Sequence, residues 1–166
     1  MRTPFDIEAV KTFIQNSSES SKIYIGADSE RYRENGIWHA DYTVAVVIHI
    51  DGSRGCKVFG KVDTEIDYDK RKDRPATRLM NEVYRASQMY LDLEEAIGYR
   101  HVEVHLDINP NIMHGSSCVV QQAIGYVRGV CNVVPMVKPN AFSASFCADR
   151  LKDILREQEK YIKVAC

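Results

Sequence analysis

The chain has 166 residues, of which 45% are hydrophobic and 27% are charged. This length suits one domain with a substantial core, and the composition excludes a disordered chain. The formal net charge of -1 excludes a polybasic protein, so any contact with nucleic acid must come from a local patch. No apolar run approaches the length of a membrane span, and the first residues lack the apolar segment of a signal peptide.

The five cysteines show no C-x-x-C pair, and their number is odd. We interpret four of them as reduced core thiols of a cytoplasmic protein and the fifth, at the last position, as exposed. In chain order they are Cys56, Cys118, Cys131, Cys147 and Cys166. These spacings do not predict a zinc site.

The first part of the chain predicts a short amphipathic helix followed by three strands. They cover residues 5–16, 22–28, 37–50 and 56–64. The helix is expected to pack on its own sheet, and a partner protein is the alternative. Polar residues 29–36, ending in the turn signal Asn35-Gly36, and the loop 51–55 separate the strands. Loops this short predict an antiparallel meander.

The rest of the chain predicts helices alternating with strands. The elements are a helix at 76–97, a strand at 101–107, a helix ending near Arg128, a strand at 130–137 and a helix at 141–160. Ser116 or Ser117 is a candidate N-cap of the second of these helices, and Gly129 is its candidate stop. Pro135 suggests that the last strand is an edge strand or carries a bulge.

The predicted order is β-β-β-α-β-α-β-α after a leading helix, which is the order of the ribonuclease H fold. We therefore expect an α/β domain with a mixed five-stranded sheet, in which two β-α units follow three antiparallel strands. Helices flank this sheet, and an extra helix precedes it. One domain is expected over residues 1–166, with the leading helix at 5–16 and the core at 22–152.

Four acidic residues are the candidate catalytic and metal-binding residues. Asp28 ends the first predicted strand and Asp107 ends the fourth. The ends of these two strands, with their aspartates, become adjacent if the fourth strand lies beside the first. Glu82 borders the apolar seam of helix 76–97, from which it can lean over the sheet rim. Asp149 lies about two turns into the last predicted helix.

Carboxylates gathered at one place repel each other unless cations neutralise them. Two Mg²⁺ or Mn²⁺ ions about 4 Å apart meet that need and prefer hard oxygen ligands. One ion lowers the pKa of the attacking water, and the other stabilises the oxygen that leaves during phosphodiester cleavage. The cluster therefore predicts two-metal hydrolysis.

Each carboxylate also has an ordinary interpretation. An aspartate that ends a strand is often a turn former or a helix cap. Glu82 has Arg78 and Arg85 within one helical turn, so it can belong to a surface row of ion pairs. Asp149 points away from the centre of the apolar stripe predicted for its helix, and it reaches the cluster only if that helix approaches end-on.

Several cationic residues are candidates for binding substrate phosphates. Lys138 precedes the last helix, and a solvated loop cation is its alternative. The one dense basic run lies just before and within the first turn of helix 76–97, and it can track a nucleic-acid backbone or simply be solvated. Its members are Lys70, Arg71, Lys72, Arg74 and Arg78.

Histidines and aromatic residues near the predicted site have weaker interpretations. His105 is a candidate neighbour of the metal ligands, although a satisfied core histidine is the ordinary alternative. His114 is a candidate proton shuttle by its loop position alone. Trp38 and Tyr126 are interpreted as packing residues rather than as base-stacking platforms.

Several motifs, in order along residues 22–152, resemble those of the YkuK-like proteins, a family of RNase H-like proteins from bacteria and phages. They are Ile23-Tyr24-Ile25-Gly26-Ala27-Asp28-Ser29, Arg78-Leu79 with Glu82-Val83, His105-Leu106-Asp107-Ile108-Asn109, Gly125-Tyr126-Val127-Arg128-Gly129, Lys138-Pro139, Ala144-Ser145 and Ala148-Asp149-Arg150. The resemblance implies the RNase H-like fold and a metal-dependent nuclease. Through the wider clan, it matches Asp28, Glu82, Asp107 and Asp149 to four acidic positions. One departure is Glu30, where relatives are expected to have glutamine.

Two functional hypotheses follow. The first is a cytoplasmic nuclease (a phosphodiester hydrolase) that uses two Mg²⁺ or Mn²⁺ ions and acts on RNA, an RNA–DNA hybrid or structured nucleic acid. The second is a non-catalytic nucleic-acid-binding or scaffold protein that keeps the fold without the chemistry. Neither hypothesis involves a membrane.

Overall fold

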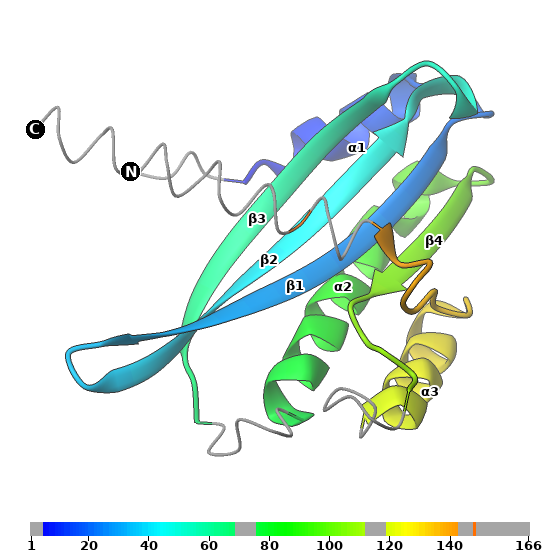
Figure 1. Ribbon diagram of the computed structural model, residues 1–166. Helices are drawn as coiled ribbons and strands as arrows, with labels where there is room; N and C mark the ends of the chain where they lie inside the picture. The colour runs from blue at the N-terminus through cyan, green and yellow to red at the C-terminus, as the bar shows by residue number, and fades with distance from the viewer. Residues whose placement is uncertain (1–4, 69–75, 112–118, 143–147, 149–166) are drawn as a thin grey trace, which may run out of the picture.

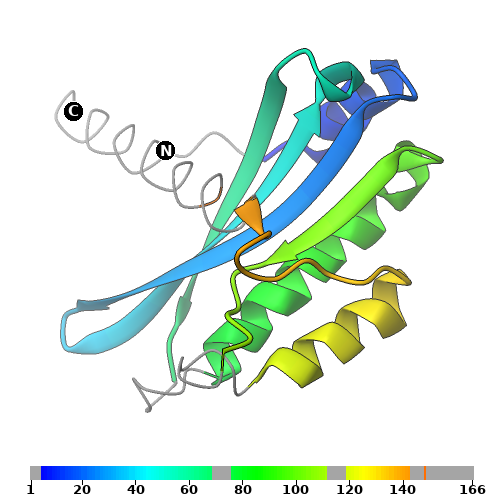
Figure 2. The same cartoon turned by 45° about the vertical axis from the view of Figure 1, so that its right-hand side comes forward.

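The computed structural model describes residues 5–68, 76–111, 119–142 and 148. Within these residues, four strands form one sheet with the order β3-β2-β1-β4. Helices α1 and α2 lie on one face of this sheet, and α3 packs beside α2 (Figures 1 and 2). The elements are α1 (Ile7–Asn16), β1 (Lys22–Glu34), β2 (Ile37–His49), the short 3-10 helix η1 (Ile50–Gly52), β3 (Cys56–Ile66), α2 (Ala76–Ile97), β4 (His101–Leu106) and α3 (Val120–Cys131).

Helix α1 is the predicted leading helix, and it docks on its own domain. The Asp6 carboxylate caps it by accepting hydrogen bonds from the backbone N–H groups of Glu8 and Ala9, at 3.0 and 3.2 Å. The apolar stripe of the helix is buried, and both Val10 and Ile14 are fully inaccessible. The helix therefore belongs to the hydrophobic core.

Strands β1, β2 and β3 form the predicted antiparallel meander. The prediction that β1 ends at Asp28 is wrong, because β1 continues to Glu34 and pairs with β2 as far as Ile37. The polar residues that favour a loop are instead held by the backbone ladder of a long partner strand. Asn35 and Gly36 make the tight turn, with φ angles of 51° and 79°.

Strand β4 lies beside β1 and parallel to it, in the register Lys22↔His101 to Ala27↔Leu106. One face of these strands contributes alternate residues to the core beneath α2. They include Ile23, Ile25 and Ala27 of β1 and Val104 and Leu106 of β4. The predicted helix 76–97 is observed with these bounds, and its seam residues Leu79, Val83, Ala86 and Leu93 are buried against the sheet.

The prediction of a fifth strand over residues 130–137 is wrong for the part of the chain that the structure describes. Only Met136 forms a bridge, parallel to His105. The Met136 N–H donates to the Val104 carbonyl, and the Leu106 N–H donates to the Met136 carbonyl, each at 2.9 Å. The preceding Pro135 has no N–H to donate, so a regular ladder does not extend through it.

Helix α3 extends further than predicted, since it passes through Gly129 and ends at Cys131, where Asn132 adopts a φ of 56°. An asparagine tolerates this left-handed conformation and ends the helix as a glycine would. The proposed caps Ser116 and Ser117 lie outside the described residues, as does most of the predicted helix 141–160.

The expectation for the cysteines is confirmed at Cys131, which is buried, and is wrong at Cys56, which is exposed at the start of edge strand β3. The other cysteines lie outside the described residues. Across those residues, no helix is long and apolar enough to cross a membrane.

Alanine substitutions at two glycines can show whether the turn of the β1–β2 hairpin needs a positive φ. A Cβ at Gly36 or Gly129 would meet no atom within 4 Å, but only Gly36 has a positive φ, of 79°. Gly36→Ala should therefore lower the free energy of unfolding by about 1 kcal/mol, because alanine is strained there. Gly129→Ala, in a helix, should raise it by about 0.5–1 kcal/mol. Urea denaturation measures both, and equal effects of the two substitutions would contradict the turn geometry.

Candidate functional site

Asp28 and Asp107 occupy neighbouring positions on the two central parallel strands. The last registered pair is Ala27↔Leu106, and the next residue on each chain segment is an aspartate. Adjacent strands run about 4.8 Å apart, and side chains alternate between faces. The two aspartates therefore come to the same rim on the face opposite Ala27 and Leu106, which pack in the core.

Glu82 approaches this rim from α2 and is almost completely buried, with 4% of its surface exposed. The hydroxyl of Ser29 donates a hydrogen bond to Oε1 of Glu82. Ser29 directly follows Asp28, so its side chain points to the helix-covered face. The Arg78 guanidinium donates to the Ser29 hydroxyl at 3.1 Å. Through Ser29, one turn of α2 is tied to β1 beside Asp28.

These contacts exclude the surface ion-pair row considered for Glu82. Arg85 faces another way: its guanidinium donates to a carboxylate oxygen of Glu65 at 2.6 Å and lies 4.0 Å from the ring centroid of Tyr42. Arg78 is partly exposed, and its guanidinium contacts Ser29 beside Glu82. Glu82 thus belongs to the interior border between α2 and β1.

Burial raises the pKa of the Glu82 carboxyl well above the ordinary value of a glutamate. The negative charges of Asp28 and, more weakly, Asp107 raise this pKa further. The hydrogen bond from Ser29 and the charge of Arg78 oppose the increase. Because both aspartates act on Glu82, these residues form one electrostatically coupled group, which we call the acidic cluster (Asp28, Glu82 and Asp107).

Lys138 supplies a positive charge to the acidic cluster. Its ammonium nitrogen lies 2.8 Å from Oδ1 of Asp107, in a partly exposed ion pair. Its backbone N–H donates to the Ile108 carbonyl at 3.1 Å, which fixes the residue next to the end of β4. Lys138 is therefore ion-paired, whereas the alternative considered from the sequence was a lysine that contacts only solvent. Its predicted contact with a phosphate stays a prediction.

The donor chemistry of the acidic cluster fits Mg²⁺ or Mn²⁺, because both ions prefer carboxylate oxygens. Burial is the main cause of the raised pKa of Glu82, and the charges of Asp28 and Asp107 add to it. However, no group of three His, Cys, Asp or Glu side chains among the described residues is arranged to hold a metal ion. Instead, the Ser29 hydroxyl contacts a carboxylate oxygen of Glu82, and the Lys138 ammonium contacts one of Asp107.

Several predicted site residues lie outside the described residues. They are Asp149, Lys70, Arg71, Lys72, Arg74 and His114. Arg78 is described, and its guanidinium contacts Ser29. Glu30 is also described: it lies two residues after Asp28 on β1, on the same face, opposite Asp41 of β2. An additional carboxylate is therefore present close to the acidic cluster.

His105 is a core residue and matches the ordinary alternative considered for it. It has no exposed surface and packs between Tyr24 and Phe142, with ring centroids at 5.4 and 4.7 Å. Burial lowers its pKa, and the neighbouring carboxylate of Glu103 partly offsets this. The buried imidazole packs against its neighbours on the strand that leads to Asp107.

Trp38 and Tyr126 likewise make packing contacts. The guanidinium of Arg31 lies 4.2 Å from the ring centroid of Trp38. Tyr126 packs edge-on against Tyr84, with centroids 4.9 Å apart.

Sequence reasoning missed Ser29, although strand alternation contained the signal. If β1 is extended past Asp28, Ser29 must face α2, as Ala27 does. The ion pair between Lys138 and Asp107 had no comparable signal, because it joins segments thirty-one positions apart.

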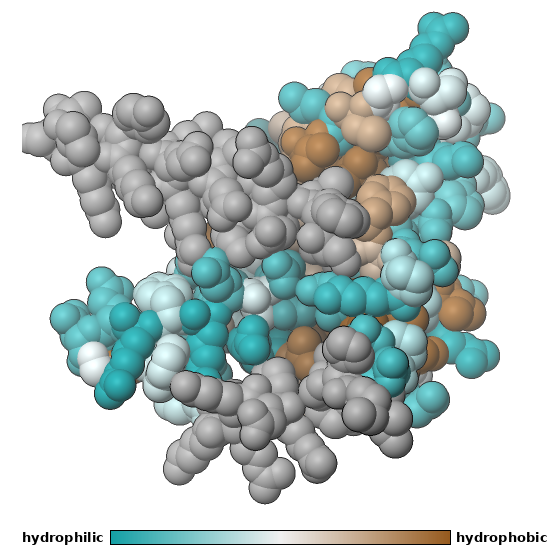
Figure 3. Space-filling view, in the orientation of Figure 1, coloured by the Kyte–Doolittle hydropathy of each residue, from teal (hydrophilic) through white to brown (hydrophobic). Residues whose placement is uncertain are grey.

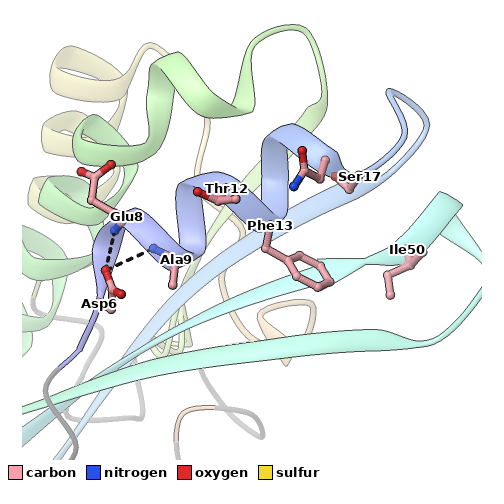
Figure 4. A pocket seen from close by; sticks show the side chains of 8 residues that line it. Asp6, Glu8, Ala9, Thr12, Phe13, Ser17 and Ile50 are labelled. Carbon is pink, nitrogen blue, oxygen red and sulfur yellow. Dashed lines mark hydrogen bonds between the residues drawn. The ribbon is translucent and has the colours of Figure 1, made fainter.

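A hollow of about 630 Å³ lies beside α1 and is separate from the acidic cluster (Figure 4). Phe13 and Ile50 contribute apolar walls. The Asp6 carboxylate at its border is already used as the cap of α1, as the dashed lines in Figure 4 show. This hollow therefore lacks a group of carboxylates available for catalysis.

The buried Glu82 carboxyl predicts a pH-dependent stability. At pH below the ordinary glutamate pKa, Glu82 is protonated in both folded and unfolded chains. As the pH rises, the unfolded chain ionises first, so Glu82 lowers the free energy of unfolding until its folded pKa is passed. In metal-free buffer, Glu82→Gln should therefore be more stable than wild type at neutral pH, by about 1 kcal/mol or more.

Thermal melts from pH 4 to 8 measure this effect, in which about 1 kcal/mol corresponds to about 2–4 °C for a chain of this size. The gain should vanish at the acidic end. Glu95→Gln, on the exposed face of the same helix, is the matched control and should follow the wild-type profile. A Glu82→Gln variant that is equally or less stable at neutral pH would contradict the buried, uncompensated carboxyl.

A comparison with protein families identifies the architecture that carries this cluster. The model of a family described as Ribonuclease H-like matches residues 6–153. Searches of curated proteins and of solved structures found no match. The family match supports the resemblance inferred from the sequence motifs, and the observed sheet is consistent with it. Because the match spans most of the chain, the protein belongs to the Ribonuclease H-like family.

Proposed function

We propose that this protein is a metal-dependent nuclease that hydrolyses phosphodiester bonds in nucleic acid, with RNA or an RNA–DNA hybrid as the favoured substrate. The observation that carries this proposal is the placement of Asp28 on β1 beside Asp107 just after β4, with the buried Glu82 of α2 hydrogen-bonded to Ser29 next to them. Family membership supports a nuclease or nucleic-acid-binding role. Two Mg²⁺ or Mn²⁺ ions are the proposed cofactors.

Each residue of the acidic cluster has a distinct part in this proposal. Asp28 and Asp107 present carboxylate oxygens from neighbouring strands, and Glu82 presents one from α2. Asp149 is the proposed fourth ligand. When bound, the metal ions would acidify the attacking water and neutralise the leaving oxygen. The burial of Glu82 restricts water at the inner side of the cluster and strengthens its interaction with cations.

Cationic residues around the cluster are proposed to bind the substrate backbone. Lys138 compensates the charge of Asp107 until cations take over that task, after which its ammonium can contact a phosphate. The proposed contacts with the phosphates along the nucleic-acid substrate come from basic residues just before α2 or in its first turn. They are Lys70, Arg71, Lys72 and Arg78. Binding through such contacts weakens as salt concentration rises.

The second candidate is a non-catalytic nucleic-acid-binding or scaffold protein. It is favoured by the ion pair between Lys138 and Asp107, which already neutralises one of the three clustered carboxylates. It is also favoured by the lack, among residues 5–68, 76–111, 119–142 and 148, of a group arranged to hold a metal ion. In this alternative, Lys138 permanently replaces a cation.

Cleavage assays test the catalytic proposal directly. End-labelled RNA, DNA and RNA–DNA hybrid are incubated with wild type, Asp107→Asn and Asp92→Asn, in Mg²⁺ or Mn²⁺. Asp92 is exposed on α2, so its variant removes the same charge at a distance from the cluster. We expect Asp107→Asn to lose at least about 100-fold in rate and Asp92→Asn to retain activity. Absence of cleavage of every substrate by folded wild type would favour the binding protein.

The ion pair of Lys138 predicts an unusual effect on metal affinity. Lys138→Met removes a positive charge that competes for Asp107, so Mn²⁺ should stabilise this variant at lower concentrations than wild type. Asp28→Asn should lose most of the stabilisation. Thermal melts over a Mn²⁺ titration measure these effects; a 100-fold excess over Kd corresponds to about 2.7 kcal/mol.

Lys61→Met is the matched control, because Lys61 is also ion-paired, with Asp63 at 3.4 Å on β3. It should leave the Mn²⁺ titration unchanged. An identical Mn²⁺ dependence in Lys138→Met and wild type would argue against competition between the ammonium and the metal ions at Asp107.

A further inference from the structure

The β1–β2 hairpin extends well beyond β4, and β3 accompanies β2 along it as far as His39. Strand β4 pairs with β1 only as far as Ala27, whereas β1 and β2 remain paired up to Glu34 and Ile37. At about 3.3 Å per residue, β1 continues for about 20 Å past Asp28. Figures 1 and 2 both show this extension, which we call the hairpin arm (residues 28–43). The arm begins at the acidic cluster and leads away from it.

One face of the hairpin arm is occupied by its own packing. The guanidinium of Arg31 lies 2.5 Å from a carboxylate oxygen of Asp67 and 4.2 Å from the ring centroid of Trp38. The Asp67 N–H donates to the Trp38 carbonyl at 2.8 Å. These contacts brace the arm against the segment that leaves β3. On this face of the arm, Arg31 and Trp38 are therefore engaged in contacts within the protein.

The other face carries a pair of stacked rings. Tyr32 and His39 are direct partners in the antiparallel register. Their ring centroids lie 5.5 Å apart with an interplanar angle of 17°, and both side chains are partly exposed. Nδ1 of His39 lies 3.1 Å from the Ile37 carbonyl, which helps to hold the imidazole in place. The pair is a preformed, flat aromatic surface.

This aromatic surface lies on the same side of the sheet as the two aspartates. Tyr32 follows Asp28 by four residues, so strand alternation gives both side chains the same face. The separation along β1 is about 13 Å, which a strand of a few nucleotides can span. The surface around the arm is largely hydrophilic, as Figure 3 shows at the end of the molecule where Figure 1 draws the hairpin. A nucleic-acid strand, which has a polar backbone and flat bases, matches both the hydrophilic surface and the aromatic rings.

We propose that the Tyr32–His39 pair is a base-stacking subsite for unpaired nucleotides of a strand that enters the acidic cluster. This inference rests on the proposed function and narrows its substrate to nucleic acid with a single-stranded segment. Aromatic side chains bind nucleobases by stacking, and such contacts tolerate any base because every base has a π-face. A cross-strand ring pair also supports its hairpin, so the test must separate the two roles.

The first experiment measures the equilibrium affinity for a fluorescein-labelled single-stranded RNA by anisotropy, with EDTA present so that metal-dependent cleavage does not occur. Tyr32→Leu should weaken binding about 5- to 100-fold, while Tyr32→Phe, which keeps the ring, should bind as wild type does. Tyr99→Leu is the matched control, because Tyr99 is fully exposed just before β4 begins. Circular dichroism confirms that each variant is folded.

The second experiment places one abasic nucleotide at successive positions of the same RNA. In wild type, affinity should fall when the abasic nucleotide occupies one or two adjacent positions. In Tyr32→Leu, affinity should no longer depend on the position of the abasic nucleotide. A substitution that only weakened the hairpin would not remove this position dependence. A flat scan in wild type, or equal affinities of Tyr32→Leu and Tyr99→Leu, overturns the subsite while leaving the nuclease proposal standing. Failure of wild type to bind any single strand in EDTA also overturns the subsite, whereas the cleavage assay in Mg²⁺ or Mn²⁺ decides the proposed function separately. Position-dependent binding without cleavage supports the subsite and removes only the catalytic part of the proposed function.

Discussion

The burial of the Glu82 carboxyl between α2 and β1 is the constraint on which the candidate site depends. A carboxyl group in this position is costly to ionise, and the negative charges of Asp28 and Asp107 increase that cost. The protein keeps Glu82 there with a hydrogen bond from Ser29, which Arg78 in turn contacts. Stability alone does not account for this arrangement, because a buried ionisable group lowers stability wherever it must ionise. It is expected where a carboxyl group is retained to bind cations.

The same geometry connects the sheet to the proposed chemistry. The parallel register of β1 and β4 brings two aspartates to one rim, and α2 adds a third carboxyl from above the core. Lys138 then reaches Asp107 from the segment that follows the Met136 bridge. Positive charge is thus already drawn to the cluster by its own field. The long hairpin that begins at Asp28 extends the same surface outward, so that the acidic cluster and the aromatic pair share one structural support.

The fold was predictable where local pattern and tertiary structure agree. The helix 76–97 has an uninterrupted apolar seam, and the observed sheet meets the condition set for Asp28 and Asp107, because the fourth strand lies beside the first. The extension of β1 was not predictable from its polar residues 29–34, because their strand conformation depends on pairing with β2. Pro135 signalled an irregular last strand, but not its reduction to one bridge. Asp28 and Asp107 could be brought together from topology, whereas the contacts of Ser29 and Lys138 required side-chain positions.

The most direct test of this account is an NMR titration of the Glu82 carboxyl carbon in metal-free protein, for wild type and Asp28→Asn. We expect a pKa well above that of an ordinary glutamate for Glu82 in wild type. Asp28→Asn should lower this pKa, although burial should keep it raised. An ordinary pKa in wild type, unaffected by Asp28→Asn, would contradict the existence of a coupled acidic cluster and would remove the main support for a metal-dependent active site at this rim.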